Sequence, residues 1–119
     1  MKHDKAILVE GEIDVCVLHS YGFFMTVGVC GSAFTLFQAA LLSRYCSTVF
    51  VAFDGDVSGK KSIQRTMNLY KKYKFAAYQM KYIPVFLPKD KDPDESIREN
   101  GKQGFANLLK KSREELEKL

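Results

Sequence analysis

Apolar runs and helix-spaced segments alternate along the chain. Apolar stretches bounded by polar residues or glycine predict four strands, at residues 6–10, 24–29, 48–53 and 78–87. The third run, TVFVAF, is rich in β-branched and aromatic residues, which favour strands. Pro84 within the fourth run indicates an edge strand or a bend, because proline has no N–H to donate to a neighbouring strand.

Segments with apolar residues at helical spacing lie between these strands. They predict helices at residues 13–21, 35–45, 59–73 and from 93 to the end, where 111–119 form a polar helical tail. Strand–helix alternation with short connections predicts an α/β fold, with a mostly parallel sheet of about four strands flanked by helices. A chain of 119 residues has room for one compact domain, residues 1–119.

Composition indicates the cellular compartment of the protein but does not identify its function. No apolar run approaches the roughly 20 residues of a membrane span, and the N-terminal residues lack a secretion signal, so we expect a cytoplasmic protein with no membrane partner. The widely spaced Cys16, Cys30 and Cys46 are expected to be small buried hydrophobic residues in a reducing compartment. The net charge of +4 is compatible with an anionic partner but does not identify one.

Acidic residues follow three of the four predicted strands. Glu10 ends the first strand, and Asp14 comes one helical turn later. The other acids are Asp54 and Asp56 after the third strand, and Asp90, Asp92, Asp94 and Glu95 after the fourth. Because the carboxyl ends of parallel strands share one edge of the sheet, these carboxylates are predicted to converge there. Clustered carboxylates repel unless a cation neutralises them, and oxygen ligands favour Mg²⁺ or Mn²⁺. The alternative is that each acid is a helix N-cap or a solvated loop residue.

The same acids stand in motifs that resemble a known family. VEGEID at residues 9–14 and FDGDVSG at 53–59 resemble the glutamate after the first strand and the DxD after the third in the Toprim domain. That Rossmann-like domain is shared by bacterial-type primases, type IA and type II topoisomerases, some nucleases and recombination-mediator proteins. Within it, GSAFT at 31–35 and LPKDKDPDESIRENG at 87–101 are most similar to the catalytic Toprim subdomain of bacterial and phage DNA primases of the DnaG type.

Two positions depart from the primase pattern. Glu12 stands where cellular primases usually have an aromatic residue and is closer to the phage primase–helicases. Ser58 stands where primases usually have alanine. The subfamily, bacterial or phage, therefore stays open.

The resemblance implies roles for individual residues. The residues implied to hold Mg²⁺ or Mn²⁺ are Glu10, Asp54, Asp56, Asp92 and Asp94, with Asp14 as a supporting acid. Glu10, Asp54 and Asp56 are also the implied catalytic residues, Glu10 as a ligand or as an acid/base group. The implied reaction is RNA primer synthesis on a DNA template, in which a 3′-hydroxyl attacks the α-phosphate of an NTP. A replicative helicase is an implied partner, through regions other than these residues.

Two further groups of residues are candidates for binding phosphate. Gly31 and Ser32 lie in a turn that opens a predicted helix, where backbone N–H groups can hold a phosphate, although turn geometry explains them equally well. Lys60, Lys61 and Arg65 follow the DGD motif. Lys60 and Lys61 lie nearest the acids and are predicted to contact nucleic acid, with a solvated helix face as the alternative.

Other functions share parts of this pattern. FDGDV fits the aspartyl-nucleophile motif of haloacid-dehalogenase-type phosphatases, but that family carries the motif on its first strand. A receiver domain has a similar length and similar acids, yet its lysine and hydroxyl residues have no clear counterparts here. A Toprim nuclease or a binding-only Toprim module stays open, although the DPDE segment favours a primase.

Bacterial primases carry a zinc ribbon and a basic subdomain ahead of the Toprim part. Neither is present in this sequence. We therefore expect either a piece of a larger primase, weak or inactive in isolation, or a small independent Toprim protein.

Overall fold

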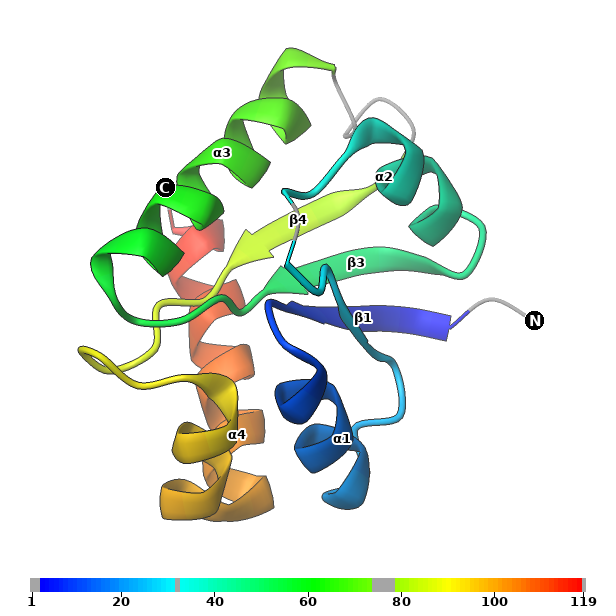
Figure 1. Cartoon of the computed structure of the whole chain (residues 1–119). Coiled ribbons are helices and arrows are strands. Elements are labelled where there is room, and N and C mark those ends of the chain that lie inside the picture. The colour runs from blue at the N-terminus through cyan, green and yellow to red at the C-terminus, as the bar shows by residue number, and fades with distance from the viewer. Residues whose placement is uncertain (1–2, 32, 74–78, 119) are drawn as a thin grey trace.

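The structure, a computed structural model, describes residues 3–31, 33–73 and 79–118, and within them strands and helices alternate strictly (Figure 1). The elements are β1 (His3–Val9), α1 (Glu12–Ser20), β2 (Thr26–Gly28), α2 (Leu36–Leu42), β3 (Cys46–Val51), α3 (Val57–Lys72), β4 (Lys81–Pro84) and α4 (Pro93–Glu117). The strands form one sheet in the order β2-β1-β3-β4, and every pair of neighbours is parallel. The predicted α/β fold is confirmed.

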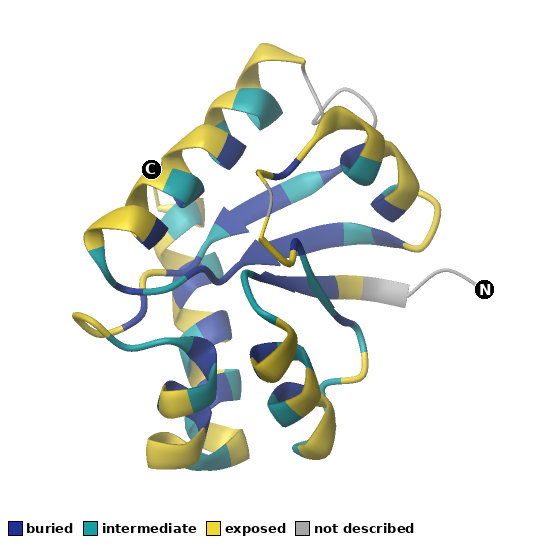
Figure 2. Ribbon diagram, viewed as in Figure 1, coloured by how far each residue is buried: buried dark blue, intermediate teal, exposed yellow. Residues whose placement is uncertain are grey.

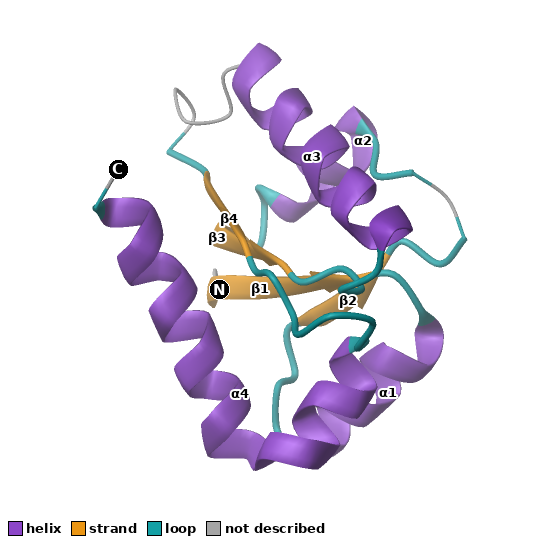
Figure 3. Ribbon diagram, turned by 90° about the vertical axis from the view of Figure 1, so that its left-hand side faces the viewer, coloured by secondary structure: helices purple, strands orange, loops and turns teal. Residues whose placement is uncertain are grey.

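Helices cover both faces of the sheet. Figures 1 and 3 show α1 and α4 on one face and α2 and α3 on the other. In register, Leu8 of β1 lies opposite Val27 of β2 and Val51 of β3, and Val51 lies opposite Pro84 of β4. The carboxyl ends of the strands therefore lie at one edge, and the loops that follow them are neighbours.

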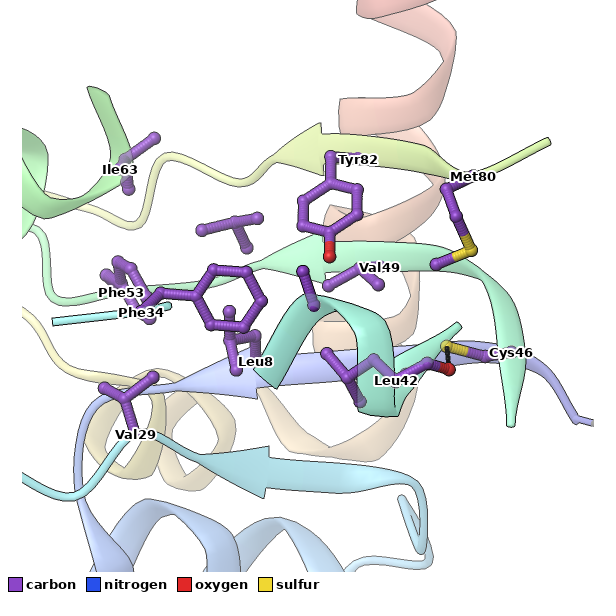
Figure 4. Packing of buried hydrophobic residues seen from close by; sticks show 13 residues of the cluster. Leu8, Val29, Phe34, Leu42, Cys46, Val49, Phe53, Ile63, Met80 and Tyr82 are labelled. Carbon is purple, nitrogen blue, oxygen red and sulfur yellow. Dashed lines mark hydrogen bonds between the residues drawn. The ribbon is translucent and has the colours of Figure 1, made fainter. Parts of the chain in front are cut away.

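The sheet separates two apolar clusters, because successive side chains of a strand point to opposite faces. Leu8, Val49 and Phe53 pack toward α2 and α3 with Phe34 and Tyr82, as Figure 4 shows. The other cluster, on the side of α1 and α4, includes Ile7, Val9, Phe50, Ile83, Leu18 and Phe105. The central strands, β1 from Ala6 to Val9 and β3, are mostly buried, as Figure 2 shows, which is typical of a parallel sheet covered on both sides.

Two predicted strands are shorter in the structure. β2 ends at Gly28, and soon afterwards Cys30 and Gly31 adopt left-handed φ angles of 51° and 86°, which turn the chain away from the sheet. β4 covers Lys81–Pro84 of the predicted 78–87, and residue 78 lies outside the described residues. β4 is an edge strand, in agreement with the prediction from Pro84.

The helix boundaries also differ from the prediction. α3 begins at Val57 rather than at residue 59, because Asp56 caps it. The helix predicted from residue 93 begins there, but it is kinked at Gly101, whose φ of 74° and ψ of 175° are not helical. The polar tail continues this helix as far as Glu117.

The prediction for the cysteines was wrong for two of the three. Cys46 is buried at the start of β3, and its thiol donates a hydrogen bond of 3.5 Å to the carbonyl oxygen of Leu42 (Figure 4). Cys16 on α1 and Cys30 after β2 are exposed.

We predict that Phe105→Ala strongly lowers the free energy of unfolding. Phe105 is 1% exposed on α4 and makes an edge-to-face contact with Phe23, with ring centroids 5.6 Å apart. Its truncation leaves a cavity and should cost about 3–5 kcal/mol, measured by urea denaturation. Phe37→Ala is the matched control: Phe37 on α2 is 77% exposed, so its truncation should change stability by less than about 0.5 kcal/mol. Similar losses in both variants would contradict the packing described for α4.

Candidate metal centre

Glu10 and Asp54 meet at the carboxyl edge of the sheet. Glu10 directly follows β1, and Asp54 follows the neighbouring strand β3. The backbone N–H of Asp54 donates a hydrogen bond of 2.9 Å to Oε1 of Glu10. This bond holds the Glu10 carboxylate against the loop after β3, so these two predicted acids are adjacent in space.

Two glycines allow the loop after β3 to pass closely between its neighbours. A Cβ on Gly59 would lie 2.0 Å from the backbone carbonyl oxygen of Asp54, and a Cβ on Gly55 would lie 2.2 Å from that of Pro88. The N–H of Gly55 also donates a hydrogen bond of 2.7 Å to the carbonyl oxygen of Lys91. The DGDVSG motif therefore requires its glycines sterically, and it joins the loops after β3 and β4.

Asp56 has a structural role that the sequence offered as the alternative to metal binding. Its Oδ1 accepts a hydrogen bond of 2.6 Å from the N–H of Gly59 and caps α3. A cap uses one carboxylate oxygen, and Asp56 is still close enough to Asp54 for its charge to raise the pKa of Asp54. The cap and a place in the acidic cluster are therefore compatible.

The acids after β4 differ in their surroundings. Asp92 caps α4: its Oδ1 accepts from the N–H of Glu95 at 2.8 Å, and its own N–H donates to Oε1 of Glu95 at 3.2 Å. Asp94 forms an ion pair with Arg98, one helical turn along α4. Asp92 thus adds negative charge near the cluster, whereas the charge of Asp94 is balanced by Arg98. Arg98 was not among the predicted residues, although its spacing of four residues from Asp94 is typical of an ion pair on a helix.

Asp14 lies buried on α1 and connects to the loop after β4. Asp14 is 7% exposed, and its Oδ1 accepts a hydrogen bond of 3.0 Å from the N–H of Asp94. Burial raises the pKa of Asp14, and the N–H of Asp94 acts in the opposite direction. Asp14 therefore lies close to the cluster, and its role as a supporting acid stays a prediction.

Asp54 is the electrostatic centre of the cluster. Its pKa is raised from 3.8 to about 7, first by burial and then by the charges of Glu10, Asp14, Asp92 and Asp56, in that order. Its Oδ1 is buried and has no hydrogen-bond partner in the described part of the chain. A buried carboxylate oxygen without a partner is costly, so a cation at this position would relieve both the desolvation and the repulsion.

The donor set fits a hard cation such as Mg²⁺ or Mn²⁺. Within residues 3–31, 33–73 and 79–118, no three His, Cys, Asp or Glu side chains lie close enough to enclose an ion by themselves. Mg²⁺ does not require such an enclosure, because it usually keeps several waters and is held by one or two carboxylates together with substrate phosphates. Glu10 and Asp54 are the side chains that best fit this role.

An open cavity lies over the cluster. It has a volume of about 460 Å³, and its walls include Glu10, Asp14, Asp54, Gly31, Ser62 and Arg65. Gly31 is therefore near the acids, and its contact with phosphate stays a prediction, while Ser32 lies outside the described residues. Lys60 and Lys61 are exposed on α3 and are not part of this wall, so their contact with nucleic acid stays a prediction. Ser62 was missed, and only its helical spacing from Arg65 could have suggested it.

The fold and the cluster together define a class of protein: a parallel α/β domain whose carboxylates gather at the carboxyl ends of its strands. Residues 7–97 match the family described as Toprim-like. Because the match covers most of the chain, the protein belongs to the Toprim-like family, in agreement with the motifs.

No helix in the described part of the chain is long and apolar enough to cross a membrane.

Curated relatives of the chain carry the name DNA primase. The DNA primase of Clostridium acetobutylicum is 39% identical over 106 residues, which are 89% of this chain and 17% of that protein. The DNA primase of Aquifex aeolicus is 39% identical over 114 residues, 96% of this chain and 22% of that protein. The chain thus spans about a fifth of the length of these relatives.

Solved primase structures share the fold. The E. coli primase catalytic core matches with a TM-score of 0.83 and 28% identity over 92% of this chain and 34% of that one. The structure of the zinc-binding and RNA polymerase domains of the Aquifex aeolicus primase matches with a TM-score of 0.78 and 36% identity over 90% of this chain and 25% of that one. The protein therefore has the fold of the Toprim part of primase catalytic cores.

We predict that Asp54→Asn stabilises the metal-free protein more at high pH than at low pH. The pKa of Asp54 is raised from 3.8 to about 7 in the folded state, so the folded protein holds this proton more tightly than the unfolded chain does. Wild-type stability should therefore fall between about pH 4 and about pH 7, and the variant lacks this loss. Because the carboxylate is partly solvated, the gain at about pH 8 should be on the order of 1 kcal/mol.

Thermal unfolding of both proteins in chelator, at about pH 5 and about pH 8, checks this expectation. A difference between variant and wild type that is the same at both pH values would show that Asp54 is not held in a repulsive, desolvated position.

Proposed function

We propose that the chain is the metal-dependent nucleotidyl-transfer domain of a DNA primase-like protein, supplying the acidic site for RNA primer synthesis on a DNA template. The observation that carries this proposal is the convergence of acids from the loops after β1, β3 and β4 on Asp54, whose pKa rises to about 7. A domain that only assembled other proteins on DNA would gain nothing from this unfavourable arrangement.

The relatives support the same proposal. They are named DNA primases, and their matched segments include nearly all of this chain. One similar solved structure, with a TM-score of 0.83 and 27% identity over 92% of this chain and 35% of that one, is described as the DnaG primase catalytic domain bound to ssDNA. By analogy, we propose DNA and NTPs as the partners of this chain.

The residues of the cluster have distinct tasks in this proposal. A bound Mg²⁺ or Mn²⁺ would neutralise charge on the reacting phosphate and favour ionisation of the attacking 3′-hydroxyl. Glu10 and Asp54 would hold the ion directly, and Asp56 would add negative charge beside it through the carboxylate oxygen that does not cap α3. Asp92 and Asp14 would add negative charge around the ion, and Asp14 would also hold the start of α4 in place through the N–H of Asp94.

The protein would also contribute to catalysis by holding the carboxylates in fixed positions. The loops after β1 and β3 are joined by the bond from Asp54 to Glu10, and those after β3 and β4 by the bond from Gly55 to Lys91. Carboxylates fixed in this way need little reorganisation when charge develops on a phosphate, which is the main source of catalysis in phosphoryl transfer.

We predict that Mn²⁺ or Mg²⁺ binds the isolated chain and raises its melting temperature. At a concentration about 100-fold above Kd the ion should stabilise the fold by about 2.7 kcal/mol. Asp54→Asn combined with Asp56→Asn should abolish the effect, because both changes remove negative charge from the cluster while asparagine can still cap α3. Isothermal titration calorimetry and thermal unfolding measure the two quantities.

Asp90→Asn is the matched control for metal binding. Asp90 lies in the same acidic loop but is exposed and is not among the charges that raise the pKa of Asp54. Its left-handed φ of 59° is one that asparagine tolerates. Equal metal binding by the double variant and by wild type, or binding of Zn²⁺ alone, would refute the metal site.

We predict that the isolated chain makes little or no primer, because it spans only about a fifth of its primase relatives and would neutralise too few template phosphates alone. Placed in the Aquifex aeolicus primase in exchange for the matched segment, it should support primer synthesis. In that chimera, Glu10→Gln or Asp54→Asn should lower the rate by about 100-fold or more, while Asp90→Asn should not. Circular dichroism of each purified chimera checks that the fold is retained.

Alternative activities are tested on the isolated chain with Mn²⁺ and three substrates: a labelled oligonucleotide, a plasmid and a chromogenic phosphate ester. We expect no turnover of any of them. Cleavage of the oligonucleotide or plasmid would replace the proposal with a Toprim nuclease, and ester hydrolysis would replace it with a phosphatase. An inactive chimera that is correctly folded would favour a binding-only Toprim module.

A further inference from the structure

A groove continues from the acidic cluster along α3. The cavity over the acids shares Glu10, Val29, Ala33, Ser62 and Arg65 with a second cavity of about 290 Å³. The second cavity extends along α3 to Lys72, and the buried Phe34 and Phe53 form part of its wall. Arg65 lies at the junction, so it is a wall residue of both cavities.

The position of Arg65 follows from how α3 is held. Asp56 caps the first turn of α3, and Gly59 packs directly against the backbone of Asp54. Ser62, Arg65 and Lys72 follow at spacings of three and seven residues, which place them on one side of the helix. The acids and the cationic side of α3 therefore line the same groove and are held in a fixed relation to each other.

Arg65 is available to a ligand. Within the described residues, no carboxylate forms an ion pair with it, although Glu10 lines the same two cavities. The Glu10 carboxylate is instead engaged through Oε1 by the N–H of Asp54. Lys60 and Lys61, nearer the DGD motif in sequence, are exposed and line neither cavity.

A ligand that satisfies both walls must carry a cation for the acids and anionic oxygen for the arginine. A divalent ion with a bound phosphate has this composition: the ion faces the carboxylates and the remaining phosphate oxygens face away from them. The planar guanidinium binds two phosphate oxygens at once, which makes arginine better suited than lysine to this task.

We infer that Arg65 is a phosphate-binding residue of this groove, which contacts the oxygens of a phosphate whose metal ion is held by Glu10 and Asp54. The inference rests on the proposed metal site and adds to it the residue that positions the phosphate. The phosphate can belong to a nucleoside triphosphate or to a nucleic-acid strand, since both present the same oxygens.

The test is calorimetric titration of the 119-residue protein with four probes: Mn²⁺ alone, tripolyphosphate with saturating Mn²⁺, a 5′-phosphorylated trinucleotide with saturating Mn²⁺, and adenosine with saturating Mn²⁺. Arg65→Ala should weaken binding of one or both phosphate probes by about tenfold and leave the affinity for Mn²⁺ alone unchanged. Arg65→Lys should recover part of the loss. Adenosine, which has no phosphate, should not bind.

Arg44→Ala is the matched control, because Arg44 is an exposed arginine just before β3, at the opposite end of the sheet. It should bind all probes as the wild type does. A greater loss for tripolyphosphate than for the trinucleotide assigns the groove to a triphosphate, and the reverse assigns it to a strand; either result supports the inference.

The inference and the proposed function fail in different ways. If wild type binds no Mn²⁺, the proposed metal site fails and the inference fails with it. If Mn²⁺ binds but Arg65→Ala keeps its affinity for both phosphate probes, or loses no more than Arg44→Ala, only the inference fails. An equal loss of affinity for Mn²⁺ alone would show that Arg65 supports the shape of the site and does not bind phosphate.

Discussion

The hydrogen bond from the N–H of Asp54 to the Glu10 carboxylate joins the ends of the two central strands, and the candidate site is arranged around it. The loops that carry these residues also bring Asp14, Asp56 and Asp92 close enough to raise the pKa of Asp54. Mutual repulsion would separate these acids in a flexible chain. Their proximity is therefore imposed by the backbone. Burial of the two apolar clusters on either side of the sheet supplies the free energy that offsets the repulsion between the acids.

In this fold, the residues that cap two helices are also ones to which the proposed phosphoryl transfer assigns a role. Asp56 caps α3 and Asp92 caps α4, each through Oδ1, which is the ordinary role of an aspartate that precedes a helix. Each cap also fixes a carboxylate at the edge of the sheet, where its second oxygen is left for another partner. The structural and the functional interpretations of these acids are therefore complementary, and the caps explain how the acids are positioned before any ion binds.

The sequence predicted the main features of the fold and the convergence of acids at the carboxyl edge of the sheet. The strand–helix alternation, the parallel sheet and the edge position of Pro84 follow from hydrophobic periodicity and from the chemistry of proline, which are local properties. The acids were identified because they directly follow apolar runs, and parallel strands bring such positions to one edge. The motifs added the family, which the match over residues 7–97 confirms.

Only the tertiary structure decided how these residues share their tasks. Asp94 is balanced by Arg98, Asp54 holds a buried oxygen without a partner in the described residues, and Arg65 lines the groove while Lys60 and Lys61 do not. The kink at Gly101 and the exposure of Cys16 were equally hidden in the sequence. Sequence patterns report whether a residue lies on a strand, a helix or a loop. Which side of a helix faces the edge of the sheet, and which charges are desolvated there, depends on contacts between segments far apart in the chain.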